Sequence, residues 1–255
     1  MGPLLKGGYL IVLAAIALAS ATSCQGNQQD TPDRVTQQVP TTIGDGQIER
    51  VQVEYGDDQV VNLFVLEPED APANAPLIMA FPWGRGSGDL VLSLLQRYWD
   101  REAPARGYIV VGVEILGPRL ETEGAQMIPA IFQWMDENFS YDAERVVATG
   151  ASNGGRGLFF AGVAAPQRYA AFIAMPGGYA EDEANLKPLR GKPVWLLVGE
   201  QDTSWREFGE ATKAKLEAQG VDVTYDVLPG QGHVLNIGQA VLMDLIDALL
   251  EREAP

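Results

Sequence analysis

The sequence predicts an α/β fold with a mostly parallel sheet covered by helices on both faces. Short apolar runs alternate with longer stretches whose apolar residues recur at three- and four-residue steps, a pattern typical of strands alternating with helices. Several of the short runs are apolar throughout, as expected for strands that are buried on both faces. The chain has 255 residues, of which 46% are hydrophobic, so it can bury one large core.

The fold is expected to begin with an antiparallel hairpin at one edge of the sheet. Residues 47–55 alternate apolar and polar side chains, and residues 60–66 follow after Gly56-Asp57-Asp58. This pattern predicts two half-buried strands joined by a tight turn.

The remaining elements are expected to alternate, so helices connect consecutive parallel strands. Asp89 is a helix-start signal, Pro129 is expected to bend the second helix, and Gly220 ends the fourth. We expect strands over residues 76–81, 108–115, 145–149, 169–175, 193–199 and 221–228. We expect helices over residues 90–101, 122–138, 154–164, 204–219 and 237–251, and no insertion is long enough for a large lid.

The N-terminal segment has the pattern of an export signal. Lys6 supplies a positive charge, and residues 9–19 form an apolar stretch that is too short to span a bilayer comfortably. Ala21-Thr22-Ser23-Cys24 resembles the lipobox of bacterial lipoproteins, which implies lipidation of Cys24. An ordinary secretory peptide cut after Ala21 is the alternative, and either pattern exports the protein.

The domain organisation follows from these patterns. Residues 1–23 are expected to be a signal peptide, and residues 24–46, rich in Gln, Asn, Thr, Asp, Gly and Pro, a lipid-anchored flexible tether. Residues 47–255 form the predicted globular domain. The expected location is the bacterial cell envelope as a lipoprotein, or otherwise the periplasm or the medium.

The composition excludes several partners and cofactors. Lys and Arg number 18 against 34 Asp and Glu, so the formal charge of −16 disfavours phosphate backbones and anionic lipids. We therefore expect no nucleic-acid partner, and membrane contact only through the N-terminal lipid anchor. One Cys and one His cannot supply a zinc site, although carboxylates could still hold calcium, and a single Cys excludes an intramolecular disulfide.

Gly150-Ala151-Ser152-Asn153-Gly154 is a Gly-x-Ser-x-Gly motif between a predicted strand and a predicted helix. A sharp strand-to-helix turn exposes a serine hydroxyl in a strained backbone conformation, and flanking glycines let strand and helix pack closely. The motif alone is a weak signal, but its context predicts Ser152 as a nucleophile.

His233, the only histidine, lies in a Gly-flanked loop between the last predicted strand and the last predicted helix. A serine hydroxyl needs a base within hydrogen-bonding reach, so His233 is the candidate base; a capping or surface role is the alternative. Enzymes with a serine at such a turn place the acid between serine and histidine in the chain. Asp202 follows an apolar strand and is preferred over Glu200, with Asp182 as a weaker third candidate.

An oxyanion hole is expected from the backbone N–H of Asn153 and one from the Gly-rich loop after the first buried parallel strand. Pro82 has no N–H, so Trp83 or Gly84 must donate. The aromatic residues Trp83, Tyr179 and Trp205 fall in loops at the same edge; they either line an acyl or aromatic pocket or serve as packing.

Residues 145–155, Arg-Val-Val-Ala-Thr-Gly-Ala-Ser-Asn-Gly-Gly, resemble the nucleophile segment of the α/β-hydrolase superfamily. More narrowly, they are similar to the secreted poly(3-hydroxybutyrate) depolymerase and feruloyl-esterase-like branch, where Ser-Asn-Gly-Gly is frequent. The resemblance covers most of residues 60–250, and Asp202 and His233 match its acid and base positions. The branch usually has a His-Gly pair in the oxyanion loop, where this chain has Pro82-Trp83.

The resemblance implies a serine hydrolase that cleaves carboxylic esters, small or polymeric, through an acyl-enzyme intermediate and without a cofactor. Two alternatives stay open: a non-catalytic surface-binding protein on a hydrolase scaffold, and a peptidase with the same triad.

Overall fold

The computed structural model describes residues 36–43 and 46–251, with side chains from Ile48 onward. Two units, residues 1–33 and 34–255, divide the chain, and every described residue belongs to the second. The expected signal peptide and Cys24 lie outside the described residues.

The described part of the chain forms a nine-stranded sheet in the order β1-β2-β3-β5-β4-β6-β7-β8-β9. The pairs along β1-β2-β3-β5 are antiparallel, and all pairs from β5 to β9 are parallel. The strands are β1 (Thr36–Ile43), β2 (Gly46–Tyr55), β3 (Gln59–Leu66), β4 (Ala75–Phe81), β5 (Ile109–Val113), β6 (Tyr141–Gly150), β7 (Ala171–Ala174), β8 (Pro193–Gly199) and β9 (Asp222–Leu228).

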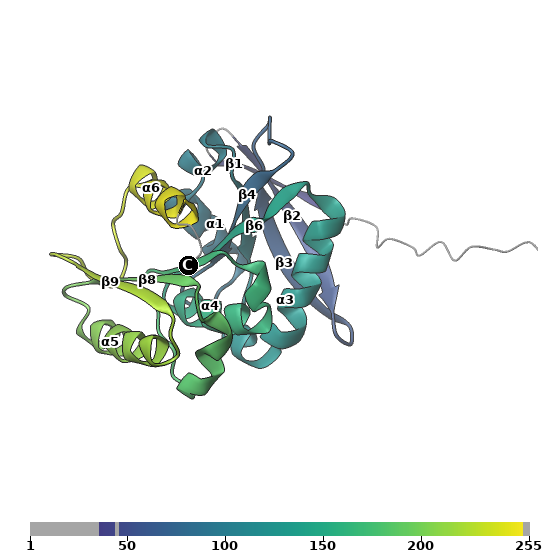
Figure 1. Cartoon of the computed structure of the whole chain (residues 1–255). Helices are drawn as coiled ribbons and strands as arrows, with labels where there is room; N and C mark the ends of the chain where they lie inside the picture. Colours follow the sequence, from purple (N-terminus) through teal and green to yellow (C-terminus); the bar gives the residue numbers. More distant parts are fainter. Residues whose placement is uncertain (1–35, 44–45, 252–255) are drawn as a thin grey trace, which may run out of the picture. The chain divides into compact units, whose positions relative to one another are not determined.

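Helices cover both faces of this sheet (Figure 1). One buried cluster contains apolar residues of α1, α2 and α6, and the other contains those of α3, α4 and α5, so the core has two layers separated by the sheet. The helices are α1 (Gly88–Tyr98), α2 (Glu102–Ala105), α3 (Arg119–Asn138), α4 (Asn153–Ala164), α5 (Thr203–Ala218) and α6 (Gln239–Leu250), with short 3-10 helices η1 (Pro166–Arg168) and η2 (Glu183–Leu189).

The register of the central strands brings their carboxyl ends to one edge of the sheet. Phe81 of β4 pairs with Gly150 of β6, and Gly150 pairs with Ala174 of β7. Gly199 of β8 pairs with Leu228, the last residue of β9. The loops that follow these strands therefore start from one edge, which is where open α/β sheets place their sites.

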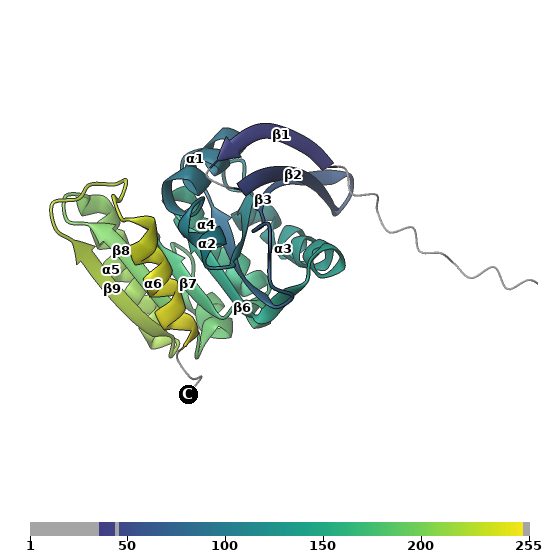
Figure 2. The ribbon, with the colours of Figure 1, turned by 90° about the horizontal axis from the view of Figure 1, so that it is seen from above.

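The structure corrects the predicted start of the domain. Residues 36–43, assigned to the flexible tether, form strand β1, which pairs with β2 from Thr36↔Val51 to Ile43↔Gly46 (Figure 2). An edge strand pairs through backbone groups, so it needs no alternating apolar face, and these mostly polar residues carry no strand pattern.

The other predicted elements are present with shifted ends. The helix predicted over residues 90–101 corresponds to α1, which ends earlier, at Tyr98; the short α2, which begins at Glu102, was not predicted. Helix α3 begins at Arg119, earlier than predicted, and continues through Pro129. The two 3-10 helices were not predicted because such short elements carry no apolar period.

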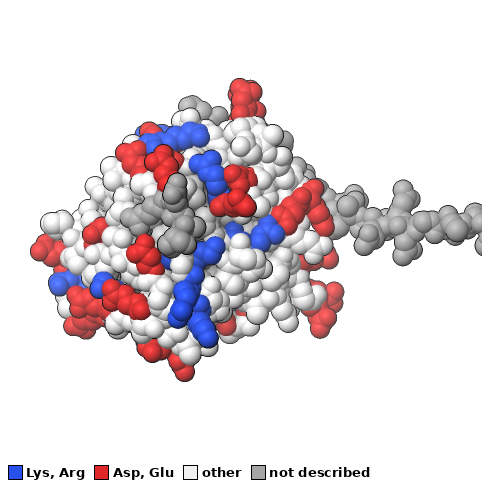
Figure 3. Space-filling view, in the orientation of Figure 1, with Lys and Arg blue, Asp and Glu red and all other residues white. Residues whose placement is uncertain are grey.

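Charged side chains are spread over the surface. On the face in Figure 3, acidic side chains occur in several places with basic side chains among them. Of the helices described here, none is long and apolar enough to cross a membrane.

Candidate active site

Ser152 lies at the sharp turn between β6 and α4, in a strained backbone conformation. Its φ of 56° and ψ of −110° are unusual for a residue with a Cβ atom. Two backbone hydrogen bonds hold the turn: Ser152 N–H donates to Pro176 O at 2.8 Å, and Ala151 N–H donates to Phe81 O at 3.1 Å. The strain is therefore offset by contacts with the last residue of β4 and with the loop after β7.

The two glycines of the motif are required because the backbone packs closely around the turn. A Cβ atom on Gly150 would lie 2.3 Å from Gly154 O, and one on Gly154 would lie 2.1 Å from Phe81 O. Both clashes involve backbone atoms, which cannot turn away as a flexible side chain could.

Ser152, His233 and Asp202 form one hydrogen-bonded line. His233 Nε2 lies 2.9 Å from Ser152 Oγ, and His233 Nδ1 lies 2.6 Å from Asp202 Oδ2. With a neutral imidazole, Nδ1–H donates to the carboxylate and Nε2 accepts from the serine hydroxyl. The Asp202 side chain is 10% exposed and that of His233 42% exposed, so the histidine is open to solvent and the carboxylate is shielded.

The two other candidate acids lie elsewhere. Glu200 Oε2 accepts a hydrogen bond from Gly230 N–H at 2.8 Å, so this carboxylate holds the start of the histidine loop and does not contact the ring. Asp182 caps the 3-10 helix η2. The structure thus brings Asp202, and neither alternative, to His233.

The loop that carries His233 is held in place by the end of α1. Leu235 O accepts hydrogen bonds from Tyr98 OH at 2.8 Å and from Arg97 Nη2 at 3.0 Å. Trp205 packs beside the imidazole, with ring centroids 5.3 Å apart. Sequence reasoning missed Tyr98 and Arg97, because no local pattern indicates a contact with a residue about 137 positions later.

The loop after β4 lies beside the turn. Gly154 N–H donates to Pro82 O at 2.9 Å, which places the candidate donors Trp83 and Gly84 next in the chain. Trp83 O accepts from Gly86 N–H at 3.1 Å and closes a tight turn, in which Gly84 has a φ of +62°. Both candidates line a pocket with Ser152.

The segment after β5 connects the two predicted halves of the oxyanion hole. Asn153 Nδ2 donates to Gly117 O at 2.9 Å, and Gly117 N–H donates to Arg85 O at 2.7 Å. Gly88 N–H donates to the buried carboxylate of Glu114 at 2.7 Å. We call residues 114–117 the brace, because they tie the loop after β4 to the first residue of α4.

A pocket of about 180 Å³ opens beside Ser152. Tyr98 lines it, and the Tyr98 ring meets that of Trp83 edge-on at a centroid distance of 6.3 Å. The lining residues are Trp83, Gly84, Tyr98, Ala151, Ser152, Met175, Pro176, His233 and Val234.

Solved structures share this arrangement of strands and helices. A dienelactone hydrolase-like promiscuous phosphotriesterase from metagenomic libraries aligns with a TM-score of 0.63 at 15% identity, over 80% of this chain and 98% of its own. An esterase of Rhizomucor miehei aligns with a TM-score of 0.61 at 17% identity, over 82% and 83%. The protein has the α/β-hydrolase fold.

The fold also occurs in longer proteins. Porphyromonas gingivalis dipeptidyl peptidase 4 aligns with a TM-score of 0.59 at 15% identity; 82% of this chain is covered but only 36% of the peptidase. The chain likewise spans 54% of a thermostable esterase. No protein-family model matches the sequence, and no curated protein matches it.

The three aromatic candidates have different places in this α/β-hydrolase fold. Trp83 lines the pocket, and Trp205 contacts His233 outside the pocket wall. Tyr179 is only 3% exposed and packs against Phe159 and Phe160, so it belongs to the core rather than to the pocket. Tyr179 follows β7 at the carboxyl ends of the parallel strands, where the site lies, but its ring points into the core. The direction of a side chain cannot be read from its position in the sequence.

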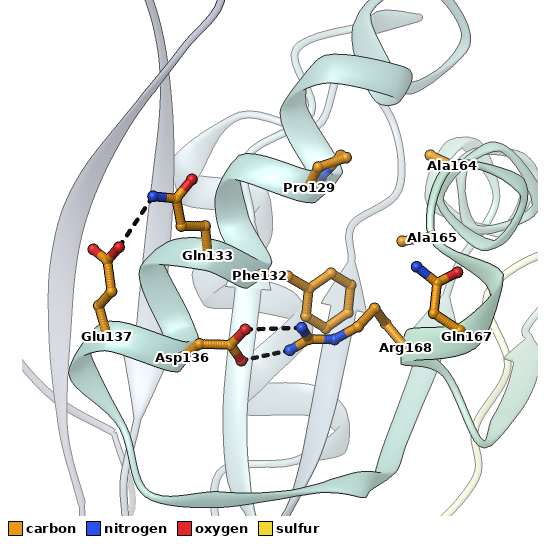
Figure 4. A pocket seen from close by; sticks show the side chains of 9 residues that line it. All are labelled: Pro129, Phe132, Gln133, Asp136, Glu137, Ala164, Ala165, Gln167 and Arg168. Atoms are coloured by element: carbon orange, nitrogen blue, oxygen red, sulfur yellow. Dashed lines mark hydrogen bonds and ion pairs between the residues drawn. The ribbon is translucent and has the colours of Figure 1, made fainter.

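A larger hollow, of about 320 Å³, lies away from these residues (Figure 4). Asp136 of α3 and Arg168 of η1 form a two-bond ion pair across it, at 2.8 and 2.5 Å, and the guanidinium lies 4.4 Å from the Phe132 ring centroid. Hydrogen bonding from Arg168 lowers the pKa of Asp136. This pair joins two helical segments and offers no nucleophile, so the smaller pocket is the candidate site. In the part of the chain that the structure describes, no three His, Cys, Asp or Glu residues gather as a metal site.

Proposed function

We propose that the protein is a serine hydrolase that cleaves carboxylic esters through an acyl-enzyme intermediate. The observation that carries this proposal is the line of hydrogen bonds from Ser152 Oγ through His233 to Asp202, 2.9 and 2.6 Å long. The strained serine turn and the α/β-hydrolase fold support it.

In the first half of the proposed reaction, Ser152 Oγ attacks the ester carbonyl carbon while His233 Nε2 takes the hydroxyl proton. The imidazolium that forms is stabilised by Asp202, which also fixes the ring orientation. Collapse of the tetrahedral intermediate expels the alcohol oxygen, which takes the proton from Nε2. An acyl group then remains bonded to Ser152 Oγ.

In the second half, water takes the position that the alcohol has left. His233 Nε2 accepts a proton from this water as its oxygen attacks the acyl carbonyl. Collapse of the second intermediate breaks the bond to Ser152 Oγ, which regains the proton, and releases the carboxylic acid.

The negative oxygen of both intermediates requires preorganised N–H donors. We assign this role to the backbone N–H of Asn153 and to that of Trp83 or Gly84. The first N–H groups of a helix have no acceptor within the helix, so Asn153 at the start of α4 is suited to hold an anion.

The test is hydrolysis of p-nitrophenyl acetate and butyrate by the full chain, together with labelling by a fluorophosphonate. We expect turnover and labelling in the wild type, loss of both in Ser152→Ala, and retention of both in the matched variant Ser93→Ala, whose serine lies on α1. Turnover of peptide p-nitroanilides without turnover of esters would favour the peptidase. A folded wild type that neither reacts nor labels would favour a binding protein.

We further propose that the protein is exported and lipid-anchored through Cys24, on the sequence pattern alone. Expression in a bacterium should give a membrane-associated protein whose N-terminal peptide carries the mass of a diacylglycerol. Cys24→Ser should abolish the added mass. Recovery of an unmodified soluble protein that begins at Thr22 would instead support the ordinary secretory peptide.

A further inference from the structure

We propose that the pocket beside Ser152 binds the acyl half of the ester, and that it selects short, uncharged acyl groups. Trp83 and Tyr98 set its depth. This inference rests on the proposed ester hydrolysis and adds to it the class of substrate.

The pocket suits the acyl group rather than the alcohol. After the first half of the reaction the alcohol must leave, and water must reach the same position beside His233 Nε2. His233 lines the pocket, but its side chain is 42% exposed, so solvent also reaches its ring. The acyl group stays bonded to Ser152 through both halves, so it can occupy the pocket without blocking this exchange.

The size of the pocket limits the length of the acyl chain. Pockets that enclose drug-sized ligands measure about 300–1,000 Å³, whereas this one measures about 180 Å³. A methylene group is about as large as a water molecule, so a pocket of this size holds a short acyl chain rather than a long one.

Of the two rings that set this limit, Tyr98 is held in place by a hydrogen bond and Trp83 by ring packing. Tyr98 is only 1% exposed, and its hydroxyl donates to Leu235 O at 2.8 Å, so its ring cannot turn aside without breaking a buried hydrogen bond. Trp83 meets this ring edge-on, a favourable arrangement for an aromatic pair. A longer chain would therefore have to displace one of two large rings.

The chemistry of the walls selects against charge. Among the described residues that line the pocket, none is Asp, Glu, Lys or Arg. A carboxylate on the acyl group would therefore be buried without a partner, which is unfavourable. The net charge of −16 acts against an anionic acyl group as well.

The first experiment measures kcat/KM of the full chain for p-nitrophenyl esters from acetate to decanoate, which share one leaving group. We expect a maximum between acetate and hexanoate and a fall of about tenfold or more by decanoate, because a chain longer than the pocket must displace the Trp83 or Tyr98 ring. Trp83→Ala keeps the backbone N–H and should move the maximum to longer chains. Val241→Ala, a change on the exposed face of α6, should leave the profile as in the wild type.

A second variant changes the pocket in the opposite direction. Val234→Trp should fill the mouth and lower kcat/KM for hexanoate far more than for acetate. The wild type should also prefer butyrate over the similarly sized, negatively charged hemisuccinate by tenfold or more. If Trp83→Ala does not fold, Val234→Trp and the hemisuccinate comparison still test the inference.

Several outcomes would overturn the inference while the serine esterase stands. These are a wild-type maximum at decanoate, an unchanged profile in both variants, or equal turnover of hemisuccinate. A strong length dependence in acetate esters of ethanol, butanol and octanol, without one in the acyl series, would assign the pocket to the alcohol. Absence of any Ser152-dependent ester turnover would instead contradict the proposed function itself.

Discussion

At the scale of single residues, the site depends on which carboxylate reaches His233. Asp202 and Glu200 are two positions apart, yet Asp202 contacts the imidazole and Glu200 contacts Gly230 N–H. The two carboxylates therefore have different roles, because Asp202 orients the imidazole and Glu200 fixes the loop on which the imidazole sits.

These separate roles predict different effects of the two amide substitutions. Asp202→Asn should lower kcat about 10³- to 10⁴-fold, because an amide no longer favours the tautomer in which Nε2 accepts the serine proton. Glu200→Gln keeps an oxygen that accepts from Gly230 N–H, so its effect should stay below about tenfold. Steady-state kinetics with p-nitrophenyl butyrate measure both, and equal losses would contradict the assignment of the acid.

The sequence was sufficient to single out the candidate residues that the structure brings together, because Ser152 and His233 lie in restrictive local contexts. Ser152 lies in a glycine-flanked turn, and the chain contains only one histidine. The supporting contacts were beyond sequence reasoning: Tyr98 reaches Leu235 only once α1 packs against the histidine loop. The same limit explains Tyr179, whose place in the chain was compatible with the pocket while its ring packs in the core.

At the scale of elements, the brace joins the loop after β4 to the start of α4 and so sets the distance between them. The backbone N–H of Asn153 and those of the loop after β4 act on the same oxygen in the proposed reaction. The Asn153 side chain donates to Gly117 O, and Gly117 N–H donates to Arg85 O. A displacement of the start of α4 is therefore transmitted through Gly117 to the loop after β4.

Asn153→Ala should therefore lower kcat by about tenfold or more with a smaller change in KM, because donors that shift by a fraction of an ångström stabilise the transition state less. Asn138→Ala is the matched control: it removes an amide-to-carbonyl bond at the end of α3, from Asn138 Nδ2 to Trp134 O. Similar losses of thermal stability in both variants, with loss of kcat only in Asn153→Ala, are the expected result. Unchanged kcat in Asn153→Ala would show that the brace has no part in positioning.

The contact between Tyr55 of β2 and Glu123 of α3 predicts that the folded state becomes less stable in alkali. Burial, with the hydrogen bond to Glu123 as a second cause, raises the pKa of Tyr55 to about 12. In the unfolded chain this phenol ionises near pH 10. The stabilisation that the protonated Tyr55 gives to the folded state is therefore fully present below about pH 10 and is lost as the pH rises toward 12.

Urea unfolding at a series of pH values measures this effect. The free energy of unfolding of the wild type should fall between about pH 10 and pH 12. The fall should be shallower in Tyr55→Phe, which has no phenol to ionise. Parallel curves for the two proteins would contradict the role of Tyr55.

Most elements of the sheet were predictable, and the exception has a physical reason. β4, β5 and β7 are buried along their whole length and are apolar throughout, so their sequences show the short continuous apolar runs that are typical of buried strands. β1 lies at the edge and pairs on one side only, through its backbone. A strand that needs no apolar side chains leaves no apolar pattern in the sequence.

At the scale of the whole molecule, an excess of acidic residues is spread over the chain rather than gathered at one site. Self-repulsion from the net charge of −16 keeps copies of the protein apart at neutral pH. We expect solubility of the full chain to reach its minimum near the isoelectric point of about 4.4. Light scattering across the pH range measures this, and a minimum near neutral pH would contradict it.

Leu235 O, which accepts hydrogen bonds from both Tyr98 and Arg97, constrains how the specificity of this scaffold can evolve. Tyr98 lines the pocket and also anchors the loop that carries His233, so replacing it changes two properties at once. Trp83 closes the same pocket, and among the described residues no hydrogen bond holds its indole. Selection for longer acyl groups would therefore accept changes at Trp83 first, and Tyr98 would change only after another anchor for Leu235 had arisen.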